Sequence, residues 1–224
     1  MSNRRIFGLW LLALLVFSGS LIAANWQYQR HLSKREFSES VNQRLASSPR
    51  AITDALMIET WQPVSFAVTL SAESKLIRKR PLDGRNGLWL VNSAIHDSGF
   101  RVPVLLGWLP ASAGANVELE IPNLPQQKFQ AIGIVRDLEA LEEAVDLPKN
   151  QILTVNPTEI SSDVPYFVQL TSPNMVLTPE FRSVPVPSIS QGPHFFYAIQ
   201  WLVFGVIALI GTAILTRQEL NVKP

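Results

Sequence analysis

The sequence predicts an α+β membrane protein in which two transmembrane helices flank one predominantly antiparallel β domain outside the cytoplasm. Two uncharged apolar runs, residues 6–24 and 195–215, predict the helices. Between them, apolar residues recur at every second position, which is the period of a half-buried strand. The expected order is therefore a cytoplasmic tail (1–5), a helix (6–24), the extracytoplasmic domain (25–194), a second helix (195–215) and a cytoplasmic tail (216–224).

The first apolar run reads IFGLWLLALLVFSGSLIAA and contains no charged residue. At about 1.5 Å per residue it is long enough to cross a hydrocarbon core of roughly 30 Å. A cleaved signal peptide is the alternative, with Arg4 and Arg5 as its basic start. An uncleaved anchor is favoured, because the run is longer than the apolar core of a signal peptide and Ile22 fits a cleavage site poorly.

The second apolar run opens with aromatic residues, which are typical of a helix that meets the membrane interface. Its flanking charges predict the orientation. No Lys or Arg lies between Arg182 and the start of the run, whereas Arg217 and Lys223 follow its end. Because positively charged flanks stay inside, the C-terminus is expected in the cytoplasm, and with two spans the N-terminus is expected there too.

Small residues in both runs predict close helix packing. Gly19 and Ala23 are four residues apart in the first run, and Gly205, Ala208 and Thr212 form a stripe in the second. The partner of each stripe stays open at this level. The two helices could pack on one another, or either could pack on helices of another protein.

The region between the runs begins as a helix and continues as strands. Residues 25–44 contain no Pro or Gly and extend the first helix, and Ser47, Ser48 and Pro49 end it. Alternation predicts later strands, and Asp97-Ser98-Gly99 predicts a hairpin turn. Strands are expected at residues 64–70, 88–95, 101–109, 128–136 and 166–170.

Two further segments complete the predicted domain. A short helix is expected over residues 138–145, with Asp137 as its cap. Residues 172–193 contain five prolines, so this segment is expected to run extended towards the second apolar run.

Composition and motifs exclude several classes of function. The absence of cysteine excludes thiol redox chemistry, disulfides and copper delivery through thiolates. A formal net charge of +1 and the lack of a basic stripe give no reason to expect nucleic acid as a partner. No nucleophile elbow, zinc-protease motif or phosphate-binding loop is present, so an enzyme is not expected. The acidic pairs Glu118/Glu120 and Glu142/Glu143 are interpreted as solvated surface.

Two of the three histidines lie where the apolar runs meet the domain. His31 follows the first run and His194 precedes the second, whereas His96 is expected to be polar surface on a strand. His194, Tyr197 and Trp201 are spaced i, i+3, i+7 and share one helix face. An imidazole beside aromatic rings can be an axial haem ligand, so His194 is a candidate metal ligand. The alternative is that His194 only caps or anchors the helix at the interface.

Five short motifs follow one another along the chain. They are Trp26-Gln27-x-x-Arg30 followed by Lys34, Arg80-Pro81 with Gly84 and Gly87, Gly107-Trp108, Gly133-x-x-Arg136, and His194-x-x-Tyr197-Ala198-x-Gln200-Trp201. In this order, and at these places relative to the apolar runs, the chain resembles the surfeit-locus-one family of cytochrome c oxidase assembly factors. The last motif is the most specific of the five. Three positions depart from the family pattern: Ala24 replaces a glycine, Leu106 replaces an arginine, and Gly192-Pro193 stand where a polar residue is usual.

The resemblance implies a non-enzymatic role in assembling a haem-copper oxidase. The expected activity is assistance of haem A insertion, and the expected partners are the catalytic subunit, haem A synthase and the lipid bilayer. His194 would coordinate the iron, Tyr197 and Trp201 would form a wall, and Trp26, Gln27 and Arg30 would contribute from the first helix. The guanidinium group of Arg30 suits a haem propionate.

Two expectations about setting and role accompany the resemblance. Because no transit peptide precedes the first run, a bacterial plasma membrane is the expected location. The alternative role is a scaffold that holds oxidase subunits during assembly without binding haem.

Overall fold

The computed structural model describes residues 3–53, 58–111, 119–142, 147–171 and 177–221. The chain divides into two compact units. The helical unit contains residues 1–41 and 188–224, and the β unit contains residues 42–187.

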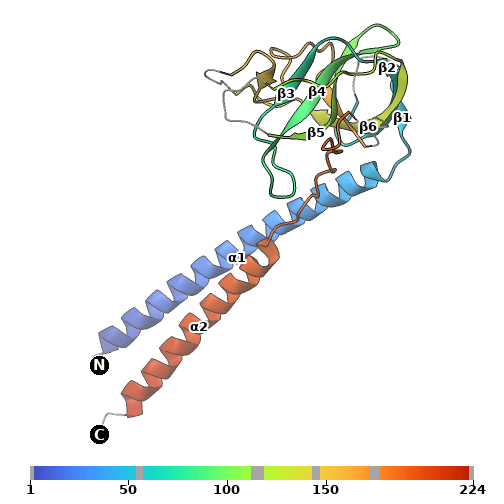
Figure 1. The fold of residues 1–224 in the computed structure, drawn as a ribbon. Coiled ribbons are helices and arrows are strands. Elements are labelled where there is room, and N and C mark those ends of the chain that lie inside the picture. Colours follow the sequence, from blue (N-terminus) through green and yellow to red (C-terminus); the bar gives the residue numbers. More distant parts are fainter. Residues whose placement is uncertain (1–2, 54–57, 112–118, 143–146, 172–176, 222–224) are drawn as a thin grey trace. The chain divides into compact units, whose positions relative to one another are not determined.

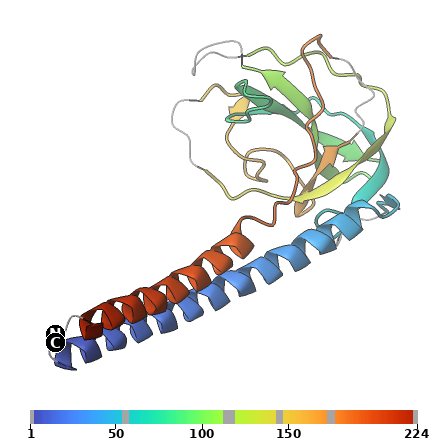
Figure 2. The same ribbon diagram turned by 90° about the horizontal axis from the view of Figure 1, so that it is seen from below.

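The helical unit consists of α1 (Asn3–Leu45) and α2 (His194–Asn221), which lie side by side and run in opposite directions (Figure 1 and Figure 2). Each is long and apolar enough to cross a membrane, so each is a candidate span. The start of α1 and the end of α2 lie at the same end of the pair (Figure 1). The predicted continuation of the first helix beyond the apolar run is confirmed, because α1 extends to Leu45.

Small residues line the seam between the helices. On α2 the buried residues are Ala198, Gly205 and Thr212, which are spaced seven apart. A Cβ added to Gly205 would lie 3.0 Å from the Phe17 ring and 3.1 Å from the Ser20 Cβ, so the glycine permits this approach. The two helices therefore pack on one another, as one of the two alternatives predicted.

The stripe predicted on the first helix is displaced by one residue from the seam. A Cβ added to Gly19 would meet nothing within 4 Å, and Ala23 is only half-buried. Ser20 and Ala24 are buried instead. The sequence gives the spacing of a small-residue stripe but not which of two adjacent stripes faces the neighbouring helix, because both have the same period.

The β unit is a mixed sheet in which most strand pairs are antiparallel. Its order is β1-β2-β6-β8-β5-β4-β3-β7, and β4 also pairs with β2. This last pairing closes β2, β6, β8, β5 and β4 into a five-stranded barrel, with β3 and β7 attached at β4 and β1 attached at β2. The strands are β1 (Arg50–Ala51), β2 (Pro63–Thr69), β3 (Ser74–Ile77), β4 (Gly87–His96), β5 (Arg101–Pro110), β6 (Phe129–Asp137), β7 (Gln151–Ile152) and β8 (Tyr166–Leu170).

Strand β4 is apolar on both faces because two cores meet there. Leu88, Leu90 and Ala94 lie in the main core. Val91 lies in a second core that also contains Phe167 from β8. The predicted hairpin between β4 and β5 is confirmed, and Gly99 in its turn has φ +94°, a conformation that favours glycine.

The five predicted strands are confirmed, with bounds that differ by at most one residue. The short strands β1, β3 and β7 were not predicted from the sequence, because two to four residues are too few to show an alternating pattern. Residues 177–193 form no helix, as predicted, whereas residues 172–176 lie outside the described part of the chain.

The predicted short helix after Asp137 is wrong for residues 138–142, which are irregular. Asp137 ends β6 and its carboxylate accepts a hydrogen bond from the Thr60 hydroxyl, so it caps no helix. Leu138 packs against the second core, and the Glu139 N–H donates to the Val155 carbonyl over 2.9 Å. These long-range contacts hold the segment extended. The remaining predicted residues, 143–145, lie outside the described ranges.

His96 is buried, so its prediction as surface is wrong. Its Nδ1 accepts from the Ser98 N–H at 3.0 Å, which leaves Nε2–H to donate to the Ile52 carbonyl at 3.2 Å. Its ring stacks on Phe100 with 4.3 Å between centroids. The pairing of β2 with β4 that closes the barrel lies at this end of β4 and includes His96 itself.

Candidate functional site

The first residue of α2 is hydrogen-bonded to α1. His194 Nδ1 lies 2.9 Å from the side-chain oxygen of Gln27. A carbonyl oxygen only accepts, so the histidine nitrogen donates, and the neutral imidazole then carries its lone pair on Nε2. Within the part of the chain that the structure describes, no group is hydrogen-bonded to Nε2. Gln27 therefore sets the tautomer of His194, and the lone pair on Nε2 is able to bind a metal ion.

Local chain geometry starts α2 at this histidine. The Tyr197 N–H donates to the Pro193 carbonyl over 3.2 Å, which is the first turn of the helix. Gly192 has φ +72°, so the chain turns sharply just before it. A Cβ added to Gly192 would lie 3.4 Å from Nε2 of His194. The glycine, which departs from the family pattern, thus keeps the Nε2 edge of the ring uncrowded.

Helical spacing places the other predicted residues around the two helices. Trp26 and Arg30 are four residues apart on one flank of α1, and the Arg30 guanidinium lies over the Trp26 ring at 5.5 Å. Tyr197 and Trp201 share with His194 one flank of α2. Trp26 lies about 200° of helical rotation from the buried Ala24 and so points away from the seam.

The aromatic side chains among these predicted residues are exposed on the surface of the helix pair. Trp26, Tyr197 and Trp201 are 54%, 46% and 40% exposed, respectively. We call Tyr197 and Trp201, which lie on the His194 flank of α2, the aromatic face. The Trp201 ring packs edge-on against Phe204 with 6.0 Å between centroids, and its predicted place beside His194 follows from helical spacing alone.

His31 lies one helical turn beyond Gln27 on α1 and is half-buried. Its ring contacts Phe195 with 5.4 Å between centroids and also lies near Tyr28 at 6.5 Å. Its Nδ1 is buried without a hydrogen-bond partner among the described residues. The two histidines that the sequence places at the helix ends therefore have different neighbours, and among the described residues no hydrogen bond or ring contact joins them.

The motif glycines and arginines of the β unit have a packing role. A Cβ at Gly87 would overlap the Trp108 ring, and the Trp108 indole donates to the Arg80 carbonyl over 2.6 Å. The Arg80 guanidinium lies 4.2 Å from the centre of the Trp89 ring and forms an ion pair with Glu139. These contacts join β4, β5 and the loop after β3, and none of them presents a reactive group.

A similar cluster surrounds Arg136. A Cβ at Gly133 would overlap β8, and the Arg136 guanidinium donates to Gln169 over 2.7 Å while it lies 4.5 Å from the centre of the Trp61 ring. Burial lowers the pKa of Arg136, and nearby Glu139 partly opposes this shift. Gln169 is fully buried and also donates to the Val184 carbonyl at 2.9 Å. Nothing in the sequence marked Gln169, because a single glutamine within an apolar strand carries no pattern.

The two other departures from the family pattern fit their surroundings. Leu106 lies in the barrel core and is 1% exposed, where an unpaired arginine would be costly. Ala24 is buried in the helical unit, where a small residue is retained in place of glycine. Neither change removes a group from the Gln27–His194 pair.

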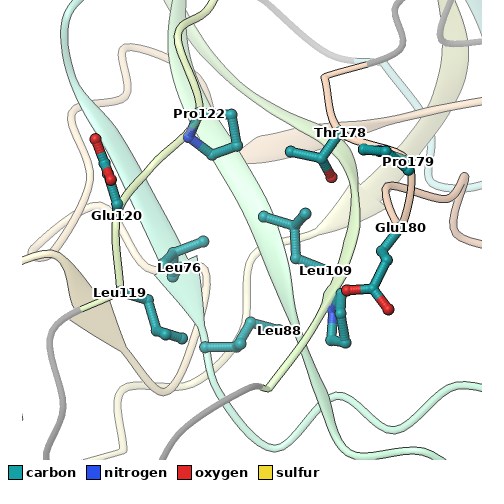
Figure 3. Close-up of a pocket in the computed structure, with 10 residues that line it drawn as sticks. Leu76, Leu88, Leu109, Leu119, Glu120, Pro122, Thr178, Pro179 and Glu180 are labelled. Atoms are coloured by element: carbon teal, nitrogen blue, oxygen red, sulfur yellow. The ribbon is translucent and has the colours of Figure 1, made fainter.

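An apolar hollow in the β unit is the rival site. It has a volume of about 390 Å³ and is lined mainly by leucine and proline side chains, with Glu120 and Glu180 on opposite sides (Figure 3). Glu180 is paired with Arg85 at 3.4 Å, and no histidine lines the hollow. Within the described ranges, no group of three or more His, Asp or Glu side chains is placed to hold a metal ion. The hollow therefore has the volume to hold a small apolar group, but its lining contains no metal-binding side chain comparable to His194.

Comparison with known proteins agrees with the family resemblance found in the sequence. A family model described as the SURF1 family matches residues 14–206, a range that includes Gln27 and His194. Proteins of Mycobacterium bovis and Mycobacterium tuberculosis, each described as an uncharacterized SURF1-like protein, are 26% identical over 156 residues. The matched region covers 66% of this chain and 56% of each relative, so the chain spans little more than half the length of the curated relatives it matches.

Proposed function

Because the chain belongs to the SURF1 family, we propose that it is a non-enzymatic assembly factor for a haem-copper terminal oxidase. In this role it assists insertion of haem A into the catalytic subunit of cytochrome c oxidase. The working site is the outer end of the helix pair, with His194 as the axial ligand.

The hydrogen bond between Gln27 and His194 carries the proposal. Histidines that bind metals usually donate their other ring N–H to a fixed acceptor, which orients the ring and strengthens the ligating nitrogen. Gln27 supplies this acceptor from the other helix at 2.9 Å. Its role is thus to support His194 rather than to face the ligand. Bound haem would supply an iron that accepts the Nε2 lone pair.

The surroundings of His194 suit a flat apolar ligand. The aromatic face offers exposed ring surface beside the imidazole, and Arg30 offers a cation for a propionate. Both α1 and α2 are candidate spans, and Gln27 lies just beyond the apolar run 6–24. Haem that leaves its synthase within the bilayer could be received at this depth and passed on. The proposal includes cytoplasmic termini and a location in the bacterial plasma membrane.

The test is haem binding by the full-length protein in detergent. Haem A is added to the wild type, to His194→Ala and to His31→Ala, and the absorption spectrum is recorded. Loss of the bound spectrum in His194→Ala alone is the expected result, since His194 has a hydrogen-bond acceptor behind its ring and His31 Nδ1 has none among the described residues. Equal haem occupancy in the wild type and His194→Ala would remove the ligand assignment.

A scaffold that never binds haem is the second candidate. The exposed aromatic side chains favour it, because Trp and Tyr are also enriched at protein–protein interfaces. The discriminating measurement is co-purification with the oxidase catalytic subunit from cells that cannot make haem A. Recovery of the complex together with an absence of haem binding in vitro would establish the scaffold.

A further inference from the structure

Two cations on α1 lie on the polar side of His194. Arg30 and Lys34 are exposed and four residues apart, a spacing that brings side chains together on one helix face. Taking Gln27 as level with His194, a rise of 1.5 Å per residue puts them about 4.5 and 10 Å further along α1. Arg30 is held over the Trp26 ring of the same helix.

Along the described helices α1 and α2, no carboxylate is paired with either of these two cations. The chain has no Asp or Glu between Glu180 and Glu219, so the start of α2 and the segment before it contribute none. On α1 the first acidic residue is Glu36, half a turn or more away from Arg30 and Lys34. Glu39 is paired with Arg35 at 2.7 Å. Within the part of the chain that the structure describes, neither Arg30 nor Lys34 forms an ion pair.

The surface on the opposite side of His194 is apolar. Along α2, Trp201 and Phe204 lie about 10 and 15 Å from His194 in the direction of the apolar run. Both rings are at least 40% exposed. Polarity therefore changes along the helix pair from two free cations, through an imidazole, to aromatic rings.

From this gradient we infer that the site selects a tetrapyrrole with free propionates and holds it in one orientation. The two propionates leave one edge of the macrocycle and pair with Arg30 and Lys34, while the apolar edge lies towards Trp201 and Phe204. This inference rests on the proposed function. Lys34 and Arg30 together determine specificity, because the two cations pair with the two propionate carboxylates on one edge of the macrocycle.

The test compares a porphyrin acid with its ester. Iron protoporphyrin and its dimethyl ester are titrated into the full-length protein in nanodiscs of phosphatidylcholine, and affinities are read from the absorption change. The wild type is expected to bind the acid about tenfold more tightly, as for two partly exposed ion pairs. In Arg30→Gln/Lys34→Gln the acid should bind as weakly as the ester, and the ester should be unaffected.

Arg35→Gln is the matched control, since it removes a cation of the same helix that is already paired with Glu39. It should leave both affinities unchanged. If acid and ester bind equally but both need His194, the orientation is wrong and the proposed function stands. If neither porphyrin shows binding that depends on His194, both the proposed function and this inference are overturned.

Anionic lipid is the competing use of the two cations. Binding of anionic lipid is measured as enrichment of phosphatidylglycerol around the protein in nanodiscs that contain this lipid. If Arg30→Gln/Lys34→Gln abolishes that enrichment and leaves the acid-to-ester ratio unchanged, the cations bind headgroups and the inference is overturned.

Discussion

Gln27 and His194 are 167 residues apart in the chain, yet the histidine Nδ1 donates to the glutamine side chain over 2.9 Å. The bond links the end of one apolar run to the beginning of the other. It also fixes which ring nitrogen remains free. The predictions below begin with this pair.

Replacing Gln27 by Leu should weaken haem binding by about 10- to 100-fold, because loss of an acceptor behind a metal-ligating histidine typically costs this much affinity. Titration of the full-length protein with haem measures the change. Gln29→Leu is the control, since Gln29 is an exposed glutamine one half-turn away on the same helix. An unchanged affinity in Gln27→Leu would show that the bond does not orient the ligand.

Gly192→Ala should weaken haem binding through crowding of the Nε2 edge. The added Cβ would lie 3.4 Å from Nε2, and the left-handed backbone at φ +72° would cost about 1–2 kcal/mol. Gly84→Ala imposes nearly the same strain at φ +73° but meets nothing within 4 Å. Comparing haem affinity in the two variants separates crowding from strain, and equal affinities would refute the role given to Gly192.

The helix pairing can be tested by a disulfide, since the chain has no cysteine of its own. A Cβ at position 205 would lie 3.1 Å from the Ser20 Cβ, so a shift of a few tenths of an ångström brings the pair into the usual disulfide range of about 3.5–4.5 Å. Ser20→Cys/Gly205→Cys is therefore expected to form an intramolecular disulfide under mild oxidation. Gly19→Cys/Gly205→Cys should not, because Gly19 faces away from the seam.

A non-reducing gel after proteolytic cleavage within the β unit reports this bond. Linked fragments for the Ser20 pair alone confirm the seam. Equal linkage in both pairs, or linkage only between separate molecules, would contradict the packing of α1 on α2.

Gly87→Ala should destabilise the β unit by roughly 3 kcal/mol, because the methyl group overlaps the buried Trp108 ring and overpacking costs about 1–3 kcal/mol or more. Urea unfolding followed by tryptophan fluorescence measures it. Gly99→Ala is the comparison: its site is open, so only the strain at φ +94° contributes. A smaller loss for Gly87→Ala than for Gly99→Ala would argue against the close approach of Trp108.

The patterns that predicted correctly are local ones. An uncharged apolar run is enough to mark 6–24 and 195–215, because the length of a span depends only on the helical rise. Alternation marks β2, which has one face on the core, whereas continuous apolar runs mark β4 and β5, which are buried on both faces. A strong local preference failed after Asp137, where contacts of Glu139 with Val155 hold the chain extended.

The sequence by itself determined the two helices, the β domain between them and, through the order of its motifs, the family. Tertiary structure alone decided that β4 returns to β2 and closes the barrel, that His96 is buried by that closure, and that Ser20 rather than Gly19 meets Gly205. It also joined Gln27 to His194 by a hydrogen bond and packed the His31 ring against Phe195. These outcomes depend on the register between segments far apart in the chain, and no local periodicity records that register.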